Sequence, residues 1–325
     1  MRRREVIAIL ASIAIAWSGT PRAQQWNRLY RIGFLRIGPP PSSFIEPFRN
    51  ELSELGYSEG RNLVIEFGLA RSAEQLPEVA AELVRRDVDL IVASGAAAVL
   101  PARDAAKGRP VIFVAGIDPI ATGLTIRELA QTGANITGLT TVQIDLTAKR
   151  MQILKEMLPS LTGVAFLVRE SNPGSADYVQ EAEKAAHALG IRLHVLKVQT
   201  TESLDAAFES ALSVGADAVV PMDDAAFTSA RRRLVELAQR HRLPGVYPIR
   251  EFVAEGGLIS LGPKYQEVYR RAAAYVDKIL KGTSAADLPV EQPTSFEIVL
   301  SLRAASALNL TIPPTLLARA DEVIE

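Results

Sequence analysis

The sequence of 325 residues contains no cysteine and only three histidines, and its acidic and basic side chains nearly cancel. The absence of cysteine excludes disulfides, zinc–thiolate sites, iron–sulfur clusters and a cysteine nucleophile. It also excludes the lipid anchor that is attached to a cysteine behind an export signal. With 36 basic and 37 acidic residues, the chain lacks the strongly basic surface that nucleic-acid binding needs. We therefore expect no nucleic-acid partner and no lipoprotein.

The motifs of common catalytic and nucleotide-binding sites are also missing. There is no G-x-x-x-x-G-K-[ST] phosphate loop, no G-x-G-x-x-G after a predicted strand and no H-E-x-x-H pair. No G-x-S-x-G nucleophile elbow is present either. His187 and His194 fall on different predicted elements, and with His241 as the only other histidine a histidine metal site is not expected. We expect no cofactor, no metal and no enzymatic activity.

Residues 1–25 have the three-part pattern of an export signal. Three arginines follow Met1, Val6–Trp17 is an apolar run of about twelve residues, and Ala23 offers a small residue for cleavage. The run is shorter than the roughly 20 residues that a membrane-spanning helix requires. We expect a periplasmic protein exported by the general secretory route, although the arginine pair before Glu5 also fits a loose twin-arginine signal. An uncleaved N-terminal membrane anchor is the alternative.

From residue 28 onward, strand and helix patterns alternate. Short apolar runs such as Val88–Ala93 are typical of strands that are covered on both faces. Amphipathic stretches such as 73–86 lie between them, with apolar residues at the spacing of one helical face. Four β-α units precede a restart at Ile136–Thr140, and a second set follows it. The predicted fold class is α/β, with two doubly wound lobes of parallel sheet.

The C-terminal part of the chain holds too few elements for a third domain. Its pattern predicts strands at Leu258–Leu261 and Phe296–Leu300 and helices at Tyr265–Leu280 and Leu302–Leu308. We assign these elements back to the two lobes, so that lobe 1 comprises residues 28–142 and 262–290, and lobe 2 comprises residues 143–261 and 291–325. Several chain crossings between two α/β lobes make a multi-crossover hinge and a cleft that can close.

Candidate ligand-binding residues follow from one rule, that ligands of open α/β sheets bind beyond the carboxyl ends of the strands. The candidates are Arg36, Ser42, Ser43, Ser94, Gly95, Asp118 and Thr140 in the first lobe, and Arg169, Asn172, Asp223, Tyr247 and Arg250 in the second. Ser94-Gly95 opens a predicted helix whose first amides could hold an anion. Each candidate could equally be a loop, cap or surface residue, as Asp223-Asp224 could cap the helix behind them. As a set they suit a small polar or zwitterionic ligand, and they include no nucleophile beside a base.

Several stretches of the chain resemble one known family. They are Leu55–Leu63 (LGYSEGRNL), Asp118-Pro119, Asn135–Leu139 (NITGL), Arg250–Val253 (REFV) with Gly256-Gly257, Tyr275–Gly282 (YVDKILKG), Ala286–Thr294 (ADLPVEQPT) and Ile312–Asp321 (IPPTLLARAD). Over essentially its whole length, the chain resembles ABC transporter substrate-binding proteins related to tryptophan and tyrosine uptake binders, which have the type I periplasmic-binding-protein fold. The resemblance implies a receptor that captures a solute by hinge closure and delivers it to an ABC permease in the inner membrane.

The resemblance also implies where the ligand binds. In such proteins the ligand carboxylate lies near hydroxyls and amides after the early strands of the first lobe. By position this implies Ser42, Ser43, Ser94 and Gly95 here, with Asp118 at the family's aspartate position.

One loop departs from the family pattern, because Arg169 and Glu170 follow Val168 where relatives often carry Trp or Leu, Asn and Pro. A charged wall suggests a different ligand, so we carry over neither tryptophan nor tyrosine. We expect a monomer that binds an amino acid or an aromatic or other organic acid. The alternatives are a sensor that signals occupancy to a membrane receptor, and an exported α/β enzyme.

Overall fold

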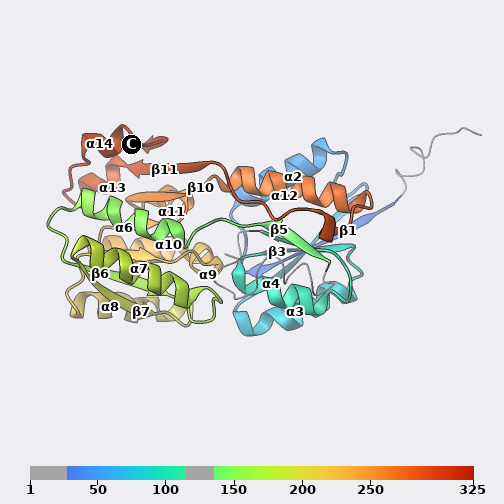
Figure 1. The fold of residues 1–325 in the computed structure, drawn as a ribbon, viewed down its shortest axis with the longest axis horizontal. Helices are drawn as coiled ribbons and strands as arrows, with labels where there is room; N and C mark the ends of the chain where they lie inside the picture. Colours follow the sequence, from blue (N-terminus) through green and yellow to red (C-terminus); the bar gives the residue numbers. More distant parts are fainter. Residues whose placement is uncertain (1–27, 115–134) are drawn as a thin grey trace, which may run out of the picture.

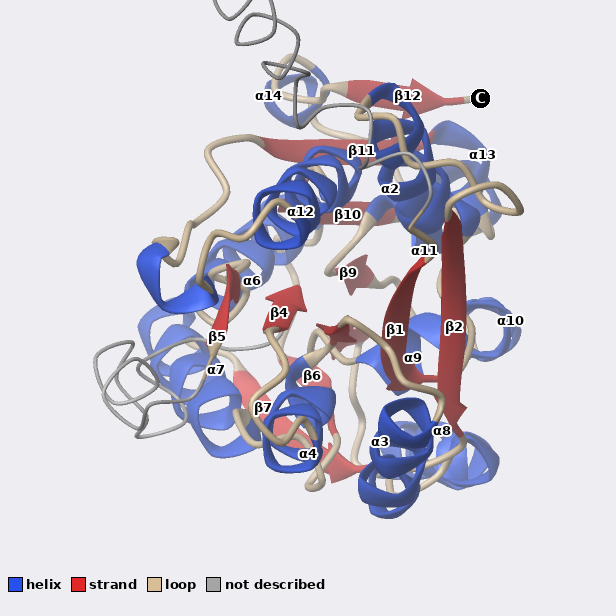
Figure 2. Ribbon diagram, turned by 90° about the vertical axis from the view of Figure 1, so that its right-hand side faces the viewer, coloured by secondary structure: helices blue, strands red, loops and turns tan. Residues whose placement is uncertain are grey.

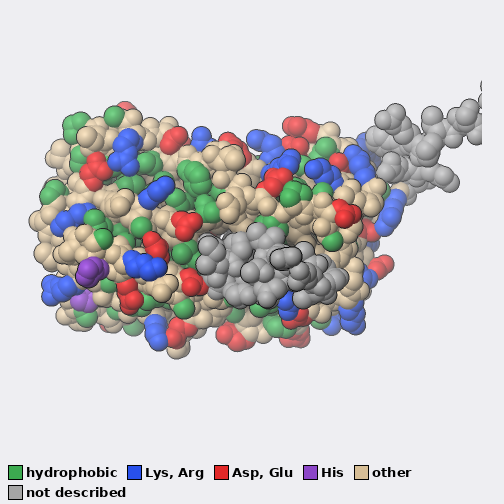
Figure 3. All heavy atoms as spheres, viewed as in Figure 1, with side chains coloured by type: hydrophobic (Ala, Val, Ile, Leu, Met, Phe, Trp, Pro, Cys, Tyr) green, Lys and Arg blue, Asp and Glu red, His purple; other side chains and the backbone are tan. Residues whose placement is uncertain are grey.

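The computed structural model describes residues 28–114 and 135–325, which form two α/β lobes side by side along the long axis of the molecule (Figure 1). The expected export signal, residues 1–25, and Asp118 lie outside the described residues. Within the part of the chain that is described, no helix is both long enough and apolar enough to cross a bilayer. Acidic and basic side chains are intermixed over the face shown in Figure 3, without a patch of one sign.

The sheet of lobe 1 has five parallel strands in the order β2-β1-β3-β4-β5. They are β1 (Tyr30–Ile37), β2 (Leu63–Ala70), β3 (Leu90–Ser94), β4 (Val111–Val114) and β5 (Ile136–Leu139). Helices α2 (Ser42–Glu54) and α12 (Tyr265–Leu280) cover one face, and α3 (Leu76–Arg85) and α4 (Ala96–Ala105) cover the other (Figure 2). Successive side chains of a strand point to opposite faces. Accordingly Ile32 and Phe34 belong to one apolar core, and Leu35 and Ile37 to the other.

The strands of lobe 2 form two sheets, ordered β7-β6-β8 and β12-β11-β10-β9, which a parallel bridge between Val219 and Gly245 connects. The strands are β6 (Gly163–Val168), β7 (Arg192–Lys197), β8 (Ala218–Pro221), β9 (Val246–Tyr247), β10 (Ile259–Pro263), β11 (Phe296–Ser301) and β12 (Glu322–Ile324). The helices are α6 (Asp145–Met157), α7 (Ser175–Leu189), α8 (Leu204–Ser213), α9 (Ala225–Ser229), α10 (Arg231–Arg240), α11 (Arg250–Ala254), α13 (Leu302–Ala307) and α14 (Pro314–Leu317). Short 3-10 turns are η3 (Thr201–Ser203) in lobe 2, and η2 (Ala73–Gln75) and η4 (Ala285–Asp287) in lobe 1.

The predicted α/β alternation is confirmed, with three differences. The helix expected at 227–240 is two helices, α9 and α10, separated at Ala230. The sequence pattern did not predict β5, α11 or β12. Strand β11 runs antiparallel to β10, with Phe296 opposite Pro263. The reason is that the chain leaves lobe 2 at the end of β10 and returns at the same end, so no crossover restores a parallel direction.

The described chain passes between the lobes three times, at residues 140–144, at Lys264 and at residues 288–295, which we call the crossing segments. As a result α12 packs beside α2 in lobe 1, although the strands before and after it, β10 and β11, lie in lobe 2 (Figure 1). The first and third segments lie side by side, because the amide of Thr140 donates to the carbonyl of Glu291 over 2.8 Å.

Candidate ligand-binding cleft

A cavity lies between the lobes at the carboxyl ends of β1, β3 and β8. Its volume is about 30 Å³, which is room for one or two water molecules. Both lobes contribute to its lining: Arg36, Phe44, Ser94, Gly95, Ala96, Tyr265 and Tyr269 from lobe 1, and Asn172, Asp223, Asp224, Ala225 and Thr228 from lobe 2. A position at strand ends and between two lobes is where open α/β folds bind small molecules.

Arg36 and Ser94 are neighbours because of strand register. Phe34 of β1 pairs with Val92 of β3 in a parallel ladder, so the side chains two residues later share one sheet face. This is the face that α12 covers, and the Ser94 hydroxyl lies 2.6 Å from the Tyr269 hydroxyl.

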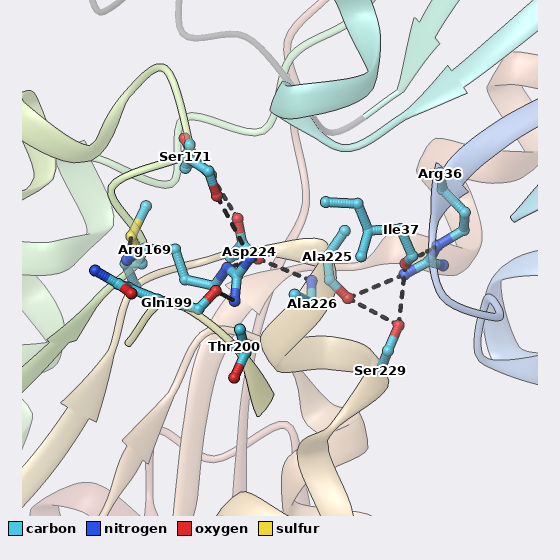
Figure 4. Close-up of polar contacts among 12 residues, drawn as sticks. Arg36, Ile37, Arg169, Ser171, Gln199, Thr200, Asp224, Ala225, Ala226 and Ser229 are labelled. Atoms are coloured by element: carbon cyan, nitrogen blue, oxygen red, sulfur yellow. Dashed lines mark hydrogen bonds and ion pairs between the residues drawn. The ribbon is translucent and has the colours of Figure 1, made fainter. Parts of the chain in front are cut away.

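The guanidinium of Arg36 is buried, with 1% of the residue exposed. Its Nε donates to the carbonyl of Ile37 over 3.3 Å, and Nη2 lies 3.5 Å from the carbonyl of Ala225 in the other lobe (Figure 4). The remaining nitrogen, Nη1, is buried and has no hydrogen-bond partner among the described residues. Burial lowers the pKa of Arg36, and the nearby carboxylates of Asp223 and Asp224 oppose that shift.

Helix α4 begins at the cavity. Its N-cap, Gly95, has a φ of 97°, a left-handed conformation that favours glycine. A Cβ at this position would stand 3.0 Å from the Cβ of Ala225 across the cleft. Ala96, the first residue of the helix, also lines the cavity. The unpaired amides and the dipole of a helix N-terminus favour negative charge at this point.

Three aromatic rings form one wall of the cavity. Phe44 of α2 stacks on Tyr265 with a centroid distance of 4.6 Å and on Tyr269 with 4.9 Å. The two tyrosines are four residues apart on α12 and therefore share one helical face. None of these three residues was predicted from the sequence. Two tyrosines at the start of a helix that follows a predicted crossing between lobes could have indicated a position at the cleft.

Asp223 and Asp224 have different roles. Asp224 is buried, accepts the amide of Ala226 over 2.8 Å and so caps α9. Its Oδ2 accepts the side-chain amide of Asn172 over 2.9 Å, and the Nε of Arg169 lies 3.6 Å from Oδ1, the oxygen that accepts the Ala226 amide. Asp223 instead faces the cavity, where its Oδ2 accepts the hydroxyl of Tyr265 over 3.0 Å. Asp224 is thus the cap of the helix, and both residues line the cavity.

Burial raises the pKa of Asp223 to about 6, against the charge of the buried Arg150, which lowers it. The guanidinium of Arg150 is held by the carbonyls of Leu261 and Gln143 and by the Gln143 side chain. Gln143 in turn donates to the hydroxyl of Tyr265 over 3.2 Å. A chain of hydrogen bonds therefore runs from the first crossing segment through Tyr265 to the cavity.

Arg169 lies behind the cavity wall rather than on it. The residue is 4% exposed, and its Nη1 donates to the carbonyl of Gln199 over 2.7 Å (Figure 4). Together with its contact to Asp224, this bond fixes the loops after β6 and β7 against α9. Its charge supports the wall, and its guanidinium does not face the ligand space.

Further contacts join the two lobes beside the cavity. The hydroxyl of Ser43 on α2 donates to Oε1 of Glu251 on α11 over 2.5 Å. The hydroxyl of Ser229 donates to the carbonyl of Ile37 over 3.1 Å (Figure 4). The second oxygen of Glu251 is buried without a partner in the described residues, and burial raises the pKa of this carboxyl.

The structure brings five of the predicted site residues to the cavity, and these are Arg36, Ser94, Gly95, Asn172 and Asp223. Ser43 and Arg169 lie beside it. Ser42 is exposed at the start of α2. Asp118 lies outside the described residues.

Three predicted residues lie elsewhere. Thr140 is in the first crossing segment and lines a separate cavity of about 280 Å³ between the crossing segments. Tyr247 stacks on Phe252 at 5.0 Å and faces a cavity of about 60 Å³ beneath α13. Arg250 pairs with Glu322 at 2.5 Å. The strand-end rule selected Tyr247 at the end of β9 and Arg250 at the start of α11 behind it, but it does not specify in which direction a side chain points.

The polar groups of the cavity are carboxylates, hydroxyls, one amide and one guanidinium. Its lining residues include no histidine, lysine or cysteine. The Ser94 hydroxyl is paired with a tyrosine rather than a base. In residues 28–114 and 135–325, no three His, Asp or Glu side chains are grouped to hold a metal ion.

Comparisons with known proteins agree with this architecture. The tyrosine-binding protein of Clostridioides difficile strain R20291 is 24% identical over 265 residues, which cover 81% of this chain and 75% of that protein. A conserved domain protein from Vibrio cholerae matches with a TM-score of 0.83 and 23% identity, over 91% of this chain and 100% of the other. An ABC domain from Streptococcus pneumoniae in complex with L-Trp matches with a TM-score of 0.80 and 24% identity, over the same shares.

The fold is therefore that of the two-lobed type I periplasmic binding proteins. The family model for ABC transporter substrate binding proteins matches residues 42–324, which is most of the chain. This chain belongs to the family of ABC transporter substrate-binding proteins.

Proposed function

We propose that this protein captures one small polar solute between its lobes and presents it to the permease of an ABC uptake transporter. The observation that carries the proposal is the composition of the cavity, which takes polar groups from both lobes at their strand ends. A cavity of about 30 Å³ is too small for such a solute, so the ligand enters when the lobes are further apart and contacts both lobes as they close on it. It therefore stabilises the arrangement in which the lobes are close, which is the differential binding that hinge closure requires.

The relatives support a ligand of amino-acid or organic-acid size. One relative is a tyrosine-binding protein, and one solved structure contains L-Trp. In this chain the N-terminus of α4 and the hydroxyl of Ser94 suit a carboxylate, and the rings of Phe44, Tyr265 and Tyr269 suit an apolar or aromatic body.

The proposed receptor has two lobes, a hinge, one copy per functional unit and a place in the periplasm. Lobe 1 comprises residues 28–142 with 264–290 and lobe 2 comprises residues 143–263 with 291–325, where the boundary expected at residues 261/262 moves because β10 extends to Pro263. The crossing segments form the hinge. The protein acts as a monomer in the periplasm after removal of residues 1–25, and it does not turn its ligand over. What supports this is the basic and apolar pattern of the N-terminus, together with a cavity lined by no nucleophile–base pair.

A ligand screen tests the proposal. Purified protein without residues 1–25 is tested by thermal shift against amino acids, aromatic acids and small carboxylates, and calorimetry then measures the affinity of each solute that stabilises it. A specific ligand raises the melting temperature by mass action. Small-angle scattering with and without that ligand reports closure as a smaller radius of gyration. Chromatography measures whether the ligand is consumed during the assay. A ligand that is converted to another compound would overturn the receptor function.

A further inference from the structure

The charges around the cavity do not balance in the way that a zwitterionic ligand needs. An amino acid requires a cationic or amide-rich site for its carboxylate and a free acceptor for its ammonium. Two acidic residues line the cavity, Asp223 and Asp224. Whether either is available for an ammonium group is decided by what each already binds.

Asp224 is fully committed. One oxygen accepts the amide of Ala226 and the other accepts the side chain of Asn172, with Arg169 as its counter-charge. Withdrawing these bonds would uncap α9 and leave a buried guanidinium unpaired, which is a large cost.

Asp223 is committed in part. Its Oδ2 accepts the Tyr265 hydroxyl, and Arg150 supplies the strongest stabilising charge for its carboxylate. The remaining oxygen suits a neutral donor such as a hydroxyl.

Arg36 forms no ion pair with a described residue, and the two carboxylates that act on its charge from further away, Asp223 and Asp224, are each engaged by another cation, Arg150 and Arg169. Its Nη1 is buried next to the cavity without a hydrogen-bond partner among the described residues. A buried charge without a partner is strongly unfavourable. The N-terminus of α4 adds positive potential to the same cavity through Gly95 and Ala96. An anion bound in the cavity would stabilise both the Arg36 guanidinium and the N-terminus of α4.

We propose that the ligand of this cleft is an organic acid with a carboxylate and no ammonium group, and that Arg36 is the residue that selects it. The inference rests on the proposed receptor function and narrows its ligand class. The carboxylate accepts Nη1 of Arg36 and the hydroxyl of Ser94, and the carbon skeleton lies against the wall formed by Phe44, Tyr265 and Tyr269. An ammonium group there would find only the remaining oxygen of Asp223, a carboxylate whose charge Arg150 already offsets.

Matched solutes test the ligand class. Each set keeps one carbon skeleton and changes the charge: 3-(4-hydroxyphenyl)propionate, L-tyrosine and 3-(4-hydroxyphenyl)propionamide in one set, and 4-methylpentanoate, L-leucine and 4-methylpentanamide in another. Short hydroxy acids and their amino-acid counterparts complete the panel. We expect every solute that stabilises the protein to be a net anion, with at least tenfold tighter binding than its zwitterionic or amide counterpart by calorimetry.

The outcomes separate the two proposals. A zwitterion or an amide that binds more tightly than its acid leaves the receptor function standing and overturns the anionic ligand. A panel in which no solute stabilises the protein counts against the receptor function itself, and against the ligand class that rests on it.

Variants test the role of Arg36. Arg36→Met removes a buried charge that has no partner, so we expect it to abolish acid binding while the ligand-free protein melts at the same or a higher temperature. A purely structural role of Arg36 predicts the opposite change, a lower melting temperature. Arg36→Lys keeps the charge but loses the planar fork. We expect it to bind acids more weakly and still prefer them, which carries the test if the methionine variant does not fold.

The control is Arg303→Gln, an arginine exposed on α13 in lobe 2, which changes net charge without touching the cleft. It should bind acids as the parent protein does. Unchanged acid affinity in Arg36→Met would overturn the assignment.

Discussion

The hydroxyl of Tyr265 donates a hydrogen bond of 3.0 Å to Asp223, and this bond joins the first residue of α12 to the cleft wall of the other lobe. The same hydroxyl accepts from Gln143 of the first crossing segment over 3.2 Å. Tyr265 also presents its ring to the cavity, stacked on Phe44. One residue therefore connects the ligand space, the crossing segment and lobe 2, so displacement of the ring by a ligand acts directly on the relative position of the lobes.

Replacing Tyr265 by phenylalanine tests that connection. The ring stays, but Asp223 loses a donor and Gln143 loses an acceptor in a buried place. We expect a loss of about 1–3 kcal/mol in the free energy of unfolding, measured in urea, and weaker ligand binding by calorimetry.

Tyr57→Phe is the matched control, because it removes a hydroxyl that donates to Asp277 over 3.0 Å within lobe 1. It should lower stability to a similar extent and leave ligand affinity unchanged. Equal effects of both variants on affinity would contradict a special role for Tyr265.

Asp223 predicts a particular pH dependence of stability. Its pKa in the folded protein is about 6 and its ordinary value is 3.8. The folded state therefore binds this proton more tightly than the unfolded state, so the contribution of Asp223 to stability falls as pH rises from about 4 to 6. Above pH 6 the ionised carboxylate costs up to about 3 kcal/mol. Arg150, Arg36, Tyr265 and Asp224 are the groups that act on it.

Asp223→Asn removes the titrating group and keeps an acceptor for Tyr265. We expect this variant to be more stable than the parent at pH 7 and close to it at pH 4.5, by urea unfolding at both values. Glu251, whose pKa burial also raises, contributes a slope of the same sign in both proteins, so it cancels in the comparison. A constant difference between the two proteins across this range would show that Asp223 does not titrate there.

The bond between Ser43 and Glu251 predicts an effect on the lobe arrangement. Ser43→Ala leaves a buried carboxylate whose two oxygens have no side-chain donor, which opposes the close approach of α2 and α11. We expect this arrangement to be destabilised by about 1.5–3 kcal/mol, the value of a hydrogen bond to a charged group. Small-angle scattering should report a larger radius of gyration.

Ser210→Ala serves as the control, since the Ser210 hydroxyl only donates to Ala206 within its own helix. Glu251→Gln should keep the acceptor for Ser43 and remove the buried charge, so its lobes should stay together. An unchanged radius of gyration in Ser43→Ala would show that the hydrogen bond between Ser43 and Glu251 does not hold the lobes together.

A side chain at Gly38 should also separate the lobes, through a steric clash. The φ of Gly38 is +64°, and a Cβ there would come 2.7 Å from the Cβ of Ser229 in the other lobe. Gly38→Ala should therefore push the lobes apart in addition to straining the backbone by about 1–2 kcal/mol. Gly108→Ala has the same kind of strain, at a φ of +86°, with nothing within 4 Å. The difference in radius of gyration between the two variants isolates the contact with Ser229, and identical radii would contradict it.

The local pattern of the sequence was enough to predict five of the residues that line the cavity. Arg36, Ser94, Gly95, Asn172 and Asp223 are all selected because they follow strands, and parallel strands end at one edge of a sheet. This inference needs no knowledge of partners. It depends on chain direction and on the apolar runs that mark the strands.

The rule that ligands bind at strand ends failed where the direction of a side chain decides whether the residue faces the cleft. Tyr247 ends a strand as Arg36 nearly does, yet its ring points away from the cleft, beside Gly245 and Gly257. A period of two identifies two faces of a strand, and both faces of a covered strand are apolar. The sequence therefore carries no mark that separates the cleft side from the outer side.

The sequence by itself determined the α/β alternation, the strand ends that surround the cleft and the absence of cysteine. The tertiary structure decided that α12 returns to lobe 1, which brings Tyr265 and Tyr269 against Phe44, and that β11 runs antiparallel to β10. It also decided that Arg36 keeps a nitrogen without a partner. Periodicity encodes which side of an element is buried, whereas the identity of its neighbour depends on contacts between residues about two hundred positions apart, such as Phe44 and Tyr265.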